Sequence, residues 1–219
     1  MESVTRGGTR WKRFALVMVP SVAATAAIGI GLAQGALAAS FSISGQEFKV
    51  KAQKLEGTDF VQYGSVAQGK TLDGKDFAAP VAVSGFKTAT ITNMCQSVVT
   101  PDVPFIGNVT LELRAGQDPK NPVKATDLYL DVSDLEADAE FKTIDIGVAA
   151  GSLQEGKEKG FPGIQPGTRA NPHGFGQRAD GAVLTNVEQK AWATTAGTFK
   201  LSGLKLKLHR GTDKECFKG

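Results

Sequence analysis

The stretch VTLELR at residues 109–114 alternates apolar and polar side chains. Successive side chains of a β-strand point to opposite faces of a sheet, so this alternation favours a strand with one face in the core and the other in water. The same period of two recurs at FKVKAQ (48–53), LYLDV (128–132), IDIGV (144–148) and LKLKLH (204–209). We therefore interpret the leucines and valines of these runs as core residues.

Turn-forming residues separate these runs, among them Asp73-Gly74, Arg210-Gly211 and the segment 116–122. The pattern predicts an all-β protein, an antiparallel sandwich or a barrel-like sheet. A β-solenoid is the alternative, because three apolar-Ser-Gly triplets recur along the chain. Residues 183–196 fit a strand better than a helix, since threonine and valine favour pleated structure.

Residues 1–38 have the layout of a signal peptide, with a basic start, a charge-free apolar middle and the small-residue exit Ala36-Leu37-Ala38. We expect cleavage after Ala38 and a secreted, extracellular or cell-envelope protein. A retained membrane anchor is the competing interpretation, because the charge-free stretch is long enough to span a bilayer. No later segment reaches that length, so residues 39–219 are expected to form a single β domain without a transmembrane span.

The net charge of +3 lies entirely in the predicted signal peptide, which holds four basic side chains and one acidic one. The rest of the chain carries equal numbers of basic and acidic groups. A nucleic-acid-binding surface needs an excess of cations, so the composition argues against a nucleic-acid partner.

Cys95 and Cys216 are the only cysteines. An exported protein meets an oxidising environment, which favours a disulfide between them, with two buried free thiols as the alternative. The cysteines and the two histidines lack the spacing of a metal site, and no phosphate-binding glycine motif is present. We expect no metal and no cofactor.

Residues 151–181 stand apart, with eight glycines and three prolines. So long a loop inside a compact domain often serves a function, and a flexible surface excursion is the plainer interpretation. Its candidate ligand contacts are Phe161, Arg169, His173, Phe175 and Arg178.

Catalytic motifs are missing from the sequence. No G-x-S-x-G pentapeptide is present to place a serine nucleophile. His173, in the loop, is the only weak candidate for a general base, and His209 ends an alternating strand as an expected surface residue. We therefore predict a non-enzymatic protein.

Five segments together resemble a known family: ASFSISGQEFKV (39–50), the run 81–100 with its MCQSVVT, FGQRAD (175–180), AWATTAGTFKLSGL (191–204) and the ending Glu215-Cys216-Phe217. The chain is similar to exported actinomycete proteins, Streptomyces especially, that form a family of unknown function. Some members carry the name cholesterol esterase, which implies a steryl-ester hydrolase. No hydrolase motif is present to match that name, so the resemblance implies no catalytic residue here.

Three functions remain open. The first is binding of a lipophilic molecule or an envelope component, because a closed sheet can enclose a ligand. The second is hydrolysis of steryl or lipid esters. The third is a structural surface protein whose sheet edges self-associate.

Overall fold

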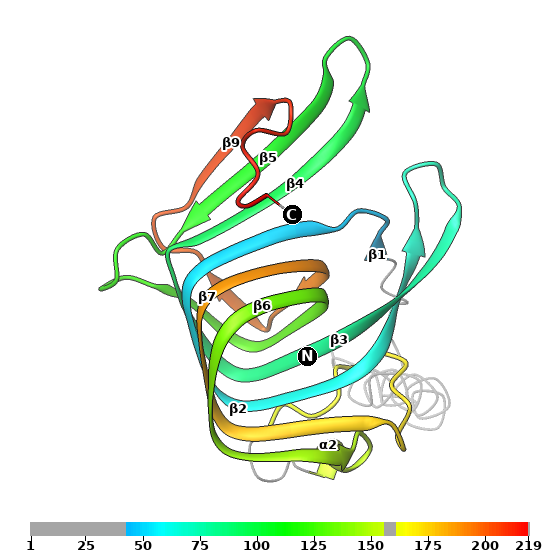
Figure 1. Ribbon diagram of the computed structural model, residues 1–219, viewed down its shortest axis with the longest axis vertical. Coiled ribbons are helices and arrows are strands. Elements are labelled where there is room, and N and C mark those ends of the chain that lie inside the picture. The colour runs from blue at the N-terminus through cyan, green and yellow to red at the C-terminus, as the bar shows by residue number, and fades with distance from the viewer. Residues whose placement is uncertain (1–42, 156–160, 219) are drawn as a thin grey trace, which may run out of the picture. The chain divides into compact units, whose positions relative to one another are not determined.

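The computed structural model describes residues 43–155 and 161–218, so the predicted signal peptide at 1–38 lies outside the described residues. They form a nine-stranded, largely antiparallel sheet and one short helix (Figure 1). In chain order the elements are β1 (Ile43–Ser44), β2 (Phe48–Lys70), β3 (Asp76–Thr92), β4 (Met94–Val103), β5 (Gly107–Ala115), β6 (Val123–Ala149), α2 (Ser152–Glu155), β7 (Phe175–Thr195), β8 (Thr198–Lys200) and β9 (Lys205–Arg210). The all-β prediction is confirmed.

One long hairpin organises the sheet. β2 pairs with β3 from Lys70 opposite Asp76 to Lys54 opposite Thr92, and then with β4 as far as Lys49 opposite Ser97. The predicted turn at Asp73-Gly74 closes this hairpin, and Gly74 takes a φ of 78°, which glycine adopts without steric cost.

The four longest strands form a closed, barrel-like ring. β3 pairs with β6, β6 with β7, β7 with β2, and β2 again with β3. Closure requires strongly bent strands, and the register of β6 against β7 shifts at several points along its length. Such irregularities bend a strand and increase its twist. The sequence pattern left a sandwich, a barrel-like sheet and a solenoid open, and the ring decides between them.

The remaining strands branch away from the ring at Asn93, which joins β3 to β4 with a φ of 52°. Asparagine tolerates this left-handed conformation better than most residues. Before Asn93, β3 pairs with β6, and after it β4 pairs with β5 instead. β5 also pairs with β9, so β4, β5 and β9 form a three-stranded extension (Figure 1).

Two apolar clusters hold the fold together. The first fills the ring and includes Phe60, Phe86, Leu128 and Leu184. The second, around Val61, Tyr63 and Tyr129, lies on the opposite face of the same strands. Because β2 presents both Phe60 and Val61 to a core, its middle is buried on both faces.

The predicted loop at 151–181 needs correction at both ends. Its first residues include α2, and β7 already begins at Phe175, so 175–181 is strand. Between them, Phe161 and Ile164 pack against the second apolar cluster, and Pro162 and Gly163 are buried. Glycine and proline here permit an irregular chain that covers a core, which composition alone did not distinguish from a surface excursion.

Candidate functional site

A pocket of about 160 Å³ lies inside the ring. β2, β3, β6 and β7 all contribute to its wall, which is mainly apolar. Its apolar lining consists of Leu55, Phe60, Phe86, Leu130, Leu135, Ala137, Ala139, Phe141, Leu184 and Val187. Phe60 lies between Phe86 and Phe141, with ring centroids 5.2 and 5.3 Å apart, so three aromatic rings form one continuous wall.

Three polar side chains, Gln62, Ser84 and Gln189, complete the lining. The Gln62 amide donates to Ser84 Oγ at 2.8 Å and accepts from the Gln177 amide at 2.6 Å, so its hydrogen-bonding groups are engaged. Gln189 is only 4% exposed, and its side-chain amide makes no hydrogen bond to any described residue. Because Gln189 lines the pocket, its amide is a ready polar contact for a bound molecule.

The pocket opens along an unpaired border of the sheet. β3 covers one edge of β6 only from Val123 to Val132, and from Ser133 to Ala149 no described strand pairs with that edge. Leu135, Ala137, Ala139 and Phe141 lie on this stretch and line the pocket, and Leu135 is 39% exposed. In Figure 1 the end of β6 is the lowest strand of the ring and lies beside the start of β7.

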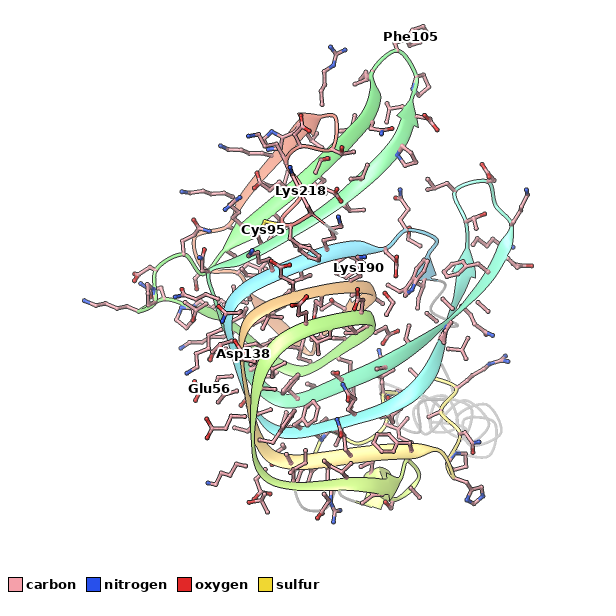
Figure 2. All side chains as sticks on the ribbon, viewed as in Figure 1. Glu56, Cys95, Phe105, Asp138, Lys190 and Lys218 are labelled. Carbon is pink, nitrogen blue, oxygen red and sulfur yellow. A yellow bond between two sulfur atoms is a disulfide. The ribbon has the colours of Figure 1, made fainter. Side chains whose placement is uncertain are left out.

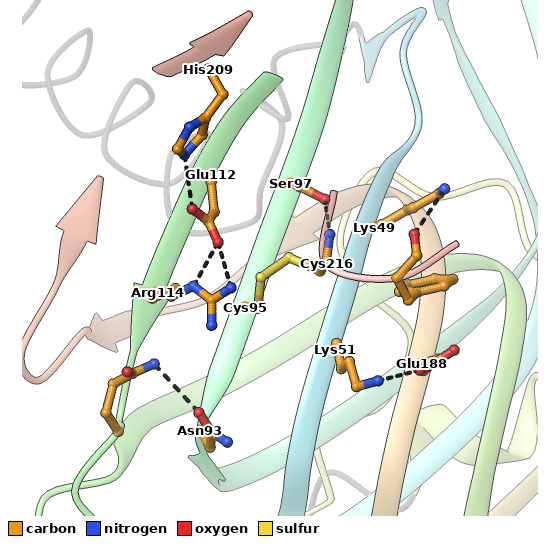
Figure 3. The surroundings of a disulfide bond; sticks show 12 residues. Lys49, Lys51, Asn93, Cys95, Ser97, Glu112, Arg114, Glu188, His209 and Cys216 are labelled. Atoms are coloured by element: carbon orange, nitrogen blue, oxygen red, sulfur yellow. Dashed lines mark hydrogen bonds and ion pairs between the residues drawn. A yellow bond between two sulfur atoms is a disulfide. The ribbon is translucent and has the colours of Figure 1, made fainter. Parts of the chain in front are cut away.

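A second cavity, of about 400 Å³, lies beside the disulfide (Figure 3). Cys95 and Cys216 are joined, with Cα atoms 5.8 Å apart, which confirms the predicted pairing. Polar side chains line this cavity, and Lys51 Nζ is 2.6 Å from Glu188 Oε1. Because its charged groups are already paired, the cavity has the chemistry of a solvated cleft.

The disulfide fastens the C-terminal segment over the polar face of the extension. The Cys216 N–H donates to Ser97 Oγ at 3.0 Å, and Thr110 Oγ1 donates to the Gly211 carbonyl at 2.6 Å. Ser97, Thr110 and Glu112 are buried in consequence. The other face carries Leu206 and Leu208, which are 57% and 68% exposed. Our interpretation of the 204–209 leucines as core residues was therefore wrong.

Glu112 is the centre of a charged cluster on that covered face. Its carboxylate lies 2.6 Å from the Arg114 guanidinium and 3.0 Å from His209 Nε2 (Figure 3). Burial alone would raise the pKa of Glu112, but the hydrogen bonds from Arg114 and His209 outweigh it and hold that pKa below its usual range. The hydroxyl of Thr110, opposite His209 in the ladder, is buried and donates to a backbone carbonyl.

The five predicted loop residues do not converge on one site. Phe161 is packed on the second apolar cluster, while Arg169 and His173 are exposed. Phe175 and Arg178 belong to β7, where Arg178 Nε donates to Asp145 Oδ2 at 2.9 Å. No hydrogen bond joins His173 or His209 to a serine, threonine or cysteine side chain of the described residues.

A group of buried polar side chains that the sequence did not predict lies beneath the 161–174 segment. Tyr129 Oη donates to the Pro162 carbonyl at 2.7 Å, and Tyr63 Oη accepts from the Gln165 N–H at 2.8 Å. Asp131 is 5% exposed on the same strands, makes no hydrogen bond or ion pair with another described residue, and burial raises its pKa to about 6.

The pocket residues were also missed, although one signal was visible. Val187, Gln189, Ala191 and Ala193 share one period-two series in β7, so a glutamine occupies a position in a run of otherwise apolar residues. The pairing of β6 with both β3 and β7 had no local signal, because ring closure depends on contacts between distant segments.

Other kinds of site find no support within residues 43–155 and 161–218. Among them no group of three His, Cys, Asp or Glu side chains could hold a metal ion. None of the described helices is both long enough and apolar enough to cross a membrane.

Residues 44–217 match the model of a family of unknown function, DUF6230, so the chain belongs to that family. No curated protein and no solved structure matches the chain.

Proposed function

We propose that this member of the family is an exported binding protein that takes an apolar group, a ring or part of an acyl chain, into the pocket of its sheet ring. The observation that carries the proposal is the combination, in one pocket, of an aromatic and aliphatic wall with the amide of Gln189, which makes no hydrogen bond to a described residue. Binding sites of this kind are mostly apolar, with a few polar groups that set the orientation of the ligand.

The size of the pocket limits what fits. About 160 Å³ is close to the ~150 Å³ of an engineered apolar cavity that binds benzene. It is smaller than the roughly 300–1,000 Å³ of sites that enclose a drug-sized molecule. One end of a lipophilic ligand therefore enters between Phe60, Phe86 and Phe141, and the rest remains outside the pocket.

Gln189 adds a polar requirement. Its amide can donate to a carbonyl or accept from a hydroxyl, so an ester, an acid or a sterol hydroxyl would satisfy it. Val187 and Gln189 also line a neighbouring void of about 20 Å³.

Export is part of the proposal. The N-terminal sequence has the order of charges and small residues that signal peptidase recognises. The Cys95–Cys216 disulfide supports it, because such bonds persist in oxidising compartments.

The test is to purify the protein without detergent, extract it with organic solvent, and identify the extract by mass spectrometry. We expect a lipophilic compound in stoichiometric amount, and less of it from Ala139→Phe, which places a ring in the pocket. Ala78→Phe, at an exposed position of β3, is the matched control. Equal recovery from both variants would place the ligand elsewhere.

A further inference from the structure

At least two edges of the described sheet lack a strand partner over several residues. β9 pairs with β5 on one side, and on its other side no described strand follows, so β9 ends the strand order. The second edge is the stretch of β6 from Ser133 to Ala149 that β3 leaves uncovered. An exposed edge offers a row of backbone N–H and C=O groups to any extended segment of matching pattern.

β9 alternates leucines with charged residues, a pattern typical of strands whose apolar face is buried, but its apolar face is exposed. Leu206 and Leu208 lie opposite Leu113 and Leu111 of β5 and are 57% and 68% exposed. At the tip of the neighbouring β4–β5 hairpin, Phe105 is fully exposed (Figure 2). The C-terminal segment covers the polar face of the extension and leaves this apolar face open.

The charges of the two edges are opposite. Lys205, Lys207 and Arg210 give β9 three cations, and none of them forms an ion pair with a described residue. The uncovered stretch of β6 reads DLEADAEF at 134–141, with acidic residues alternating with apolar ones. Within the described chain, Glu136 and Glu140 have no hydrogen bond or ion pair of their own.

We propose that β9 of one copy pairs with residues 134–141 of β6 in a second copy. Both segments alternate with a period of two, so one register satisfies both faces at once. With Leu206 opposite Ala139 in an antiparallel pair, Lys205 lies opposite Glu140 on the outer face. Lys207 then lies opposite Asp138, with Glu136 and Glu140 as its diagonal neighbours. The leucines of β9 then join Leu135, Ala137 and Ala139 on the inner face.

The contact is head-to-tail, because it joins two different surfaces of the chain. Each copy keeps one free edge of each kind, so copies add in a row unless the row closes into a ring. Pairing β9 with β9 of another copy would bring lysines together, and like charges across a sheet are unfavourable. This inference goes beyond ligand binding and does not depend on it, since the charges that drive it point out of the pocket.

The test uses charge reversal on each edge of the full chain, with molar mass measured by light scattering after size exclusion. We expect the wild-type mass to rise with concentration to at least about twice that of the monomer. Lys205→Glu/Lys207→Glu and Glu136→Lys/Glu140→Lys should each remain monomeric, since like-charged edges weaken association by about 100-fold or more.

Mixing the two charge-reversed variants tests directly whether β9 of one copy pairs with β6 of another. The acidic β9 of one variant then meets the basic β6 of the other, so an equimolar mixture should regain the wild-type mass. Lys75→Glu/Lys120→Glu, at two exposed lysines in turns, has the same change in net charge as the β9 variant and should assemble like wild type. Circular dichroism of each variant separates lost pairing from lost fold.

Three results would overturn the proposal. They are a wild-type protein that stays monomeric at every concentration, a mixture that stays monomeric, and a control that loses assembly with the others. Vesicles of anionic phospholipid serve as a further probe. Monomers that bind them through Lys205 and Lys207, with no effect of Glu136→Lys/Glu140→Lys, would assign the leucine face to a lipid surface instead.

Discussion

Replacing Asp131 with asparagine should stabilise the protein at neutral pH. Asp131 is buried without a hydrogen-bond or ion-pair partner among the described residues, and burial raises its pKa from 3.8 to about 6. An unfolded chain ionises this carboxyl near pH 4, whereas the folded chain resists ionisation until about pH 6. The contribution of Asp131 to the free energy of unfolding is therefore most favourable below pH 4 and becomes less favourable as the pH rises to about 6.

The magnitude follows from the size of the shift. A difference of about two pH units corresponds to about 3 kcal/mol of unfolding free energy, at roughly 1.4 kcal/mol per unit. The substituted asparagine would be neutral at every pH and nearly equal in volume to the aspartate. The variant should match wild type near pH 3.5 and exceed its free energy of unfolding by up to about 3 kcal/mol above pH 6.5.

Urea denaturation of both proteins at pH values from 3.5 to 7.5 measures this difference directly. Other carboxyl groups titrate in both proteins and cancel in the comparison. Asp134→Asn is the matched control, because Asp134 is exposed three residues along the same strand. A constant gap between wild type and Asp131→Asn, or a wild type that is more stable at pH 7, would refute the reasoning.

Four further outcomes follow from the structure. Removing the disulfide by Cys95→Ala/Cys216→Ala should lower the free energy of unfolding by about 5 kcal/mol, since the bond spans 121 positions, and urea denaturation of the oxidised wild type and the variant measures it. Glu112→Gln should cost about 2 kcal/mol at pH 7 in the same assay. The cost should shrink as the pH falls below about 4.5, because the lowered pKa of Glu112 makes its contribution disappear on protonation, and a pH-independent cost would contradict this. In limited proteolysis Arg178 should resist trypsin, because β7 is paired with both β6 and β2 there, and early cleavage after Arg178 would show that this part of β7 opens. Intact-mass analysis of culture medium should find a chain beginning at Ala39, and full-length protein confined to membranes would contradict export.

The sequence predicted where strands form better than it predicted which of their faces are buried. Alternation in the runs around Leu111, Leu130 and Leu206 identified β5, β6 and β9 correctly, because a period of two is a local property of the backbone. It could not say which face of a strand is covered. That depends on distant segments, as when the C-terminal segment buries Glu112 and leaves Leu206 in water.

The same limit explains what was missed at the candidate site. Two cysteines in a chain with a predicted signal peptide were enough to predict the disulfide, because few alternatives existed. The pocket around Gln189 forms only when β2, β3, β6 and β7 close into a ring, and no local pattern encodes that closure. The glycines and prolines of 151–181 marked an irregular segment, but Phe161 and Ile164 determine that part of it packs on a core.

The central claim, that the ring binds an apolar group, is tested most directly by titration with a fluorescent fatty acid. Wild type and the Ala78→Phe control should give the same saturable isotherm, with one site per chain. Ala139→Phe adds a ring at a position that lines the pocket opposite Leu184, and it should weaken binding by about tenfold or more while leaving the fold intact. Identical isotherms for all three proteins, or no saturable binding by wild type, would contradict the account.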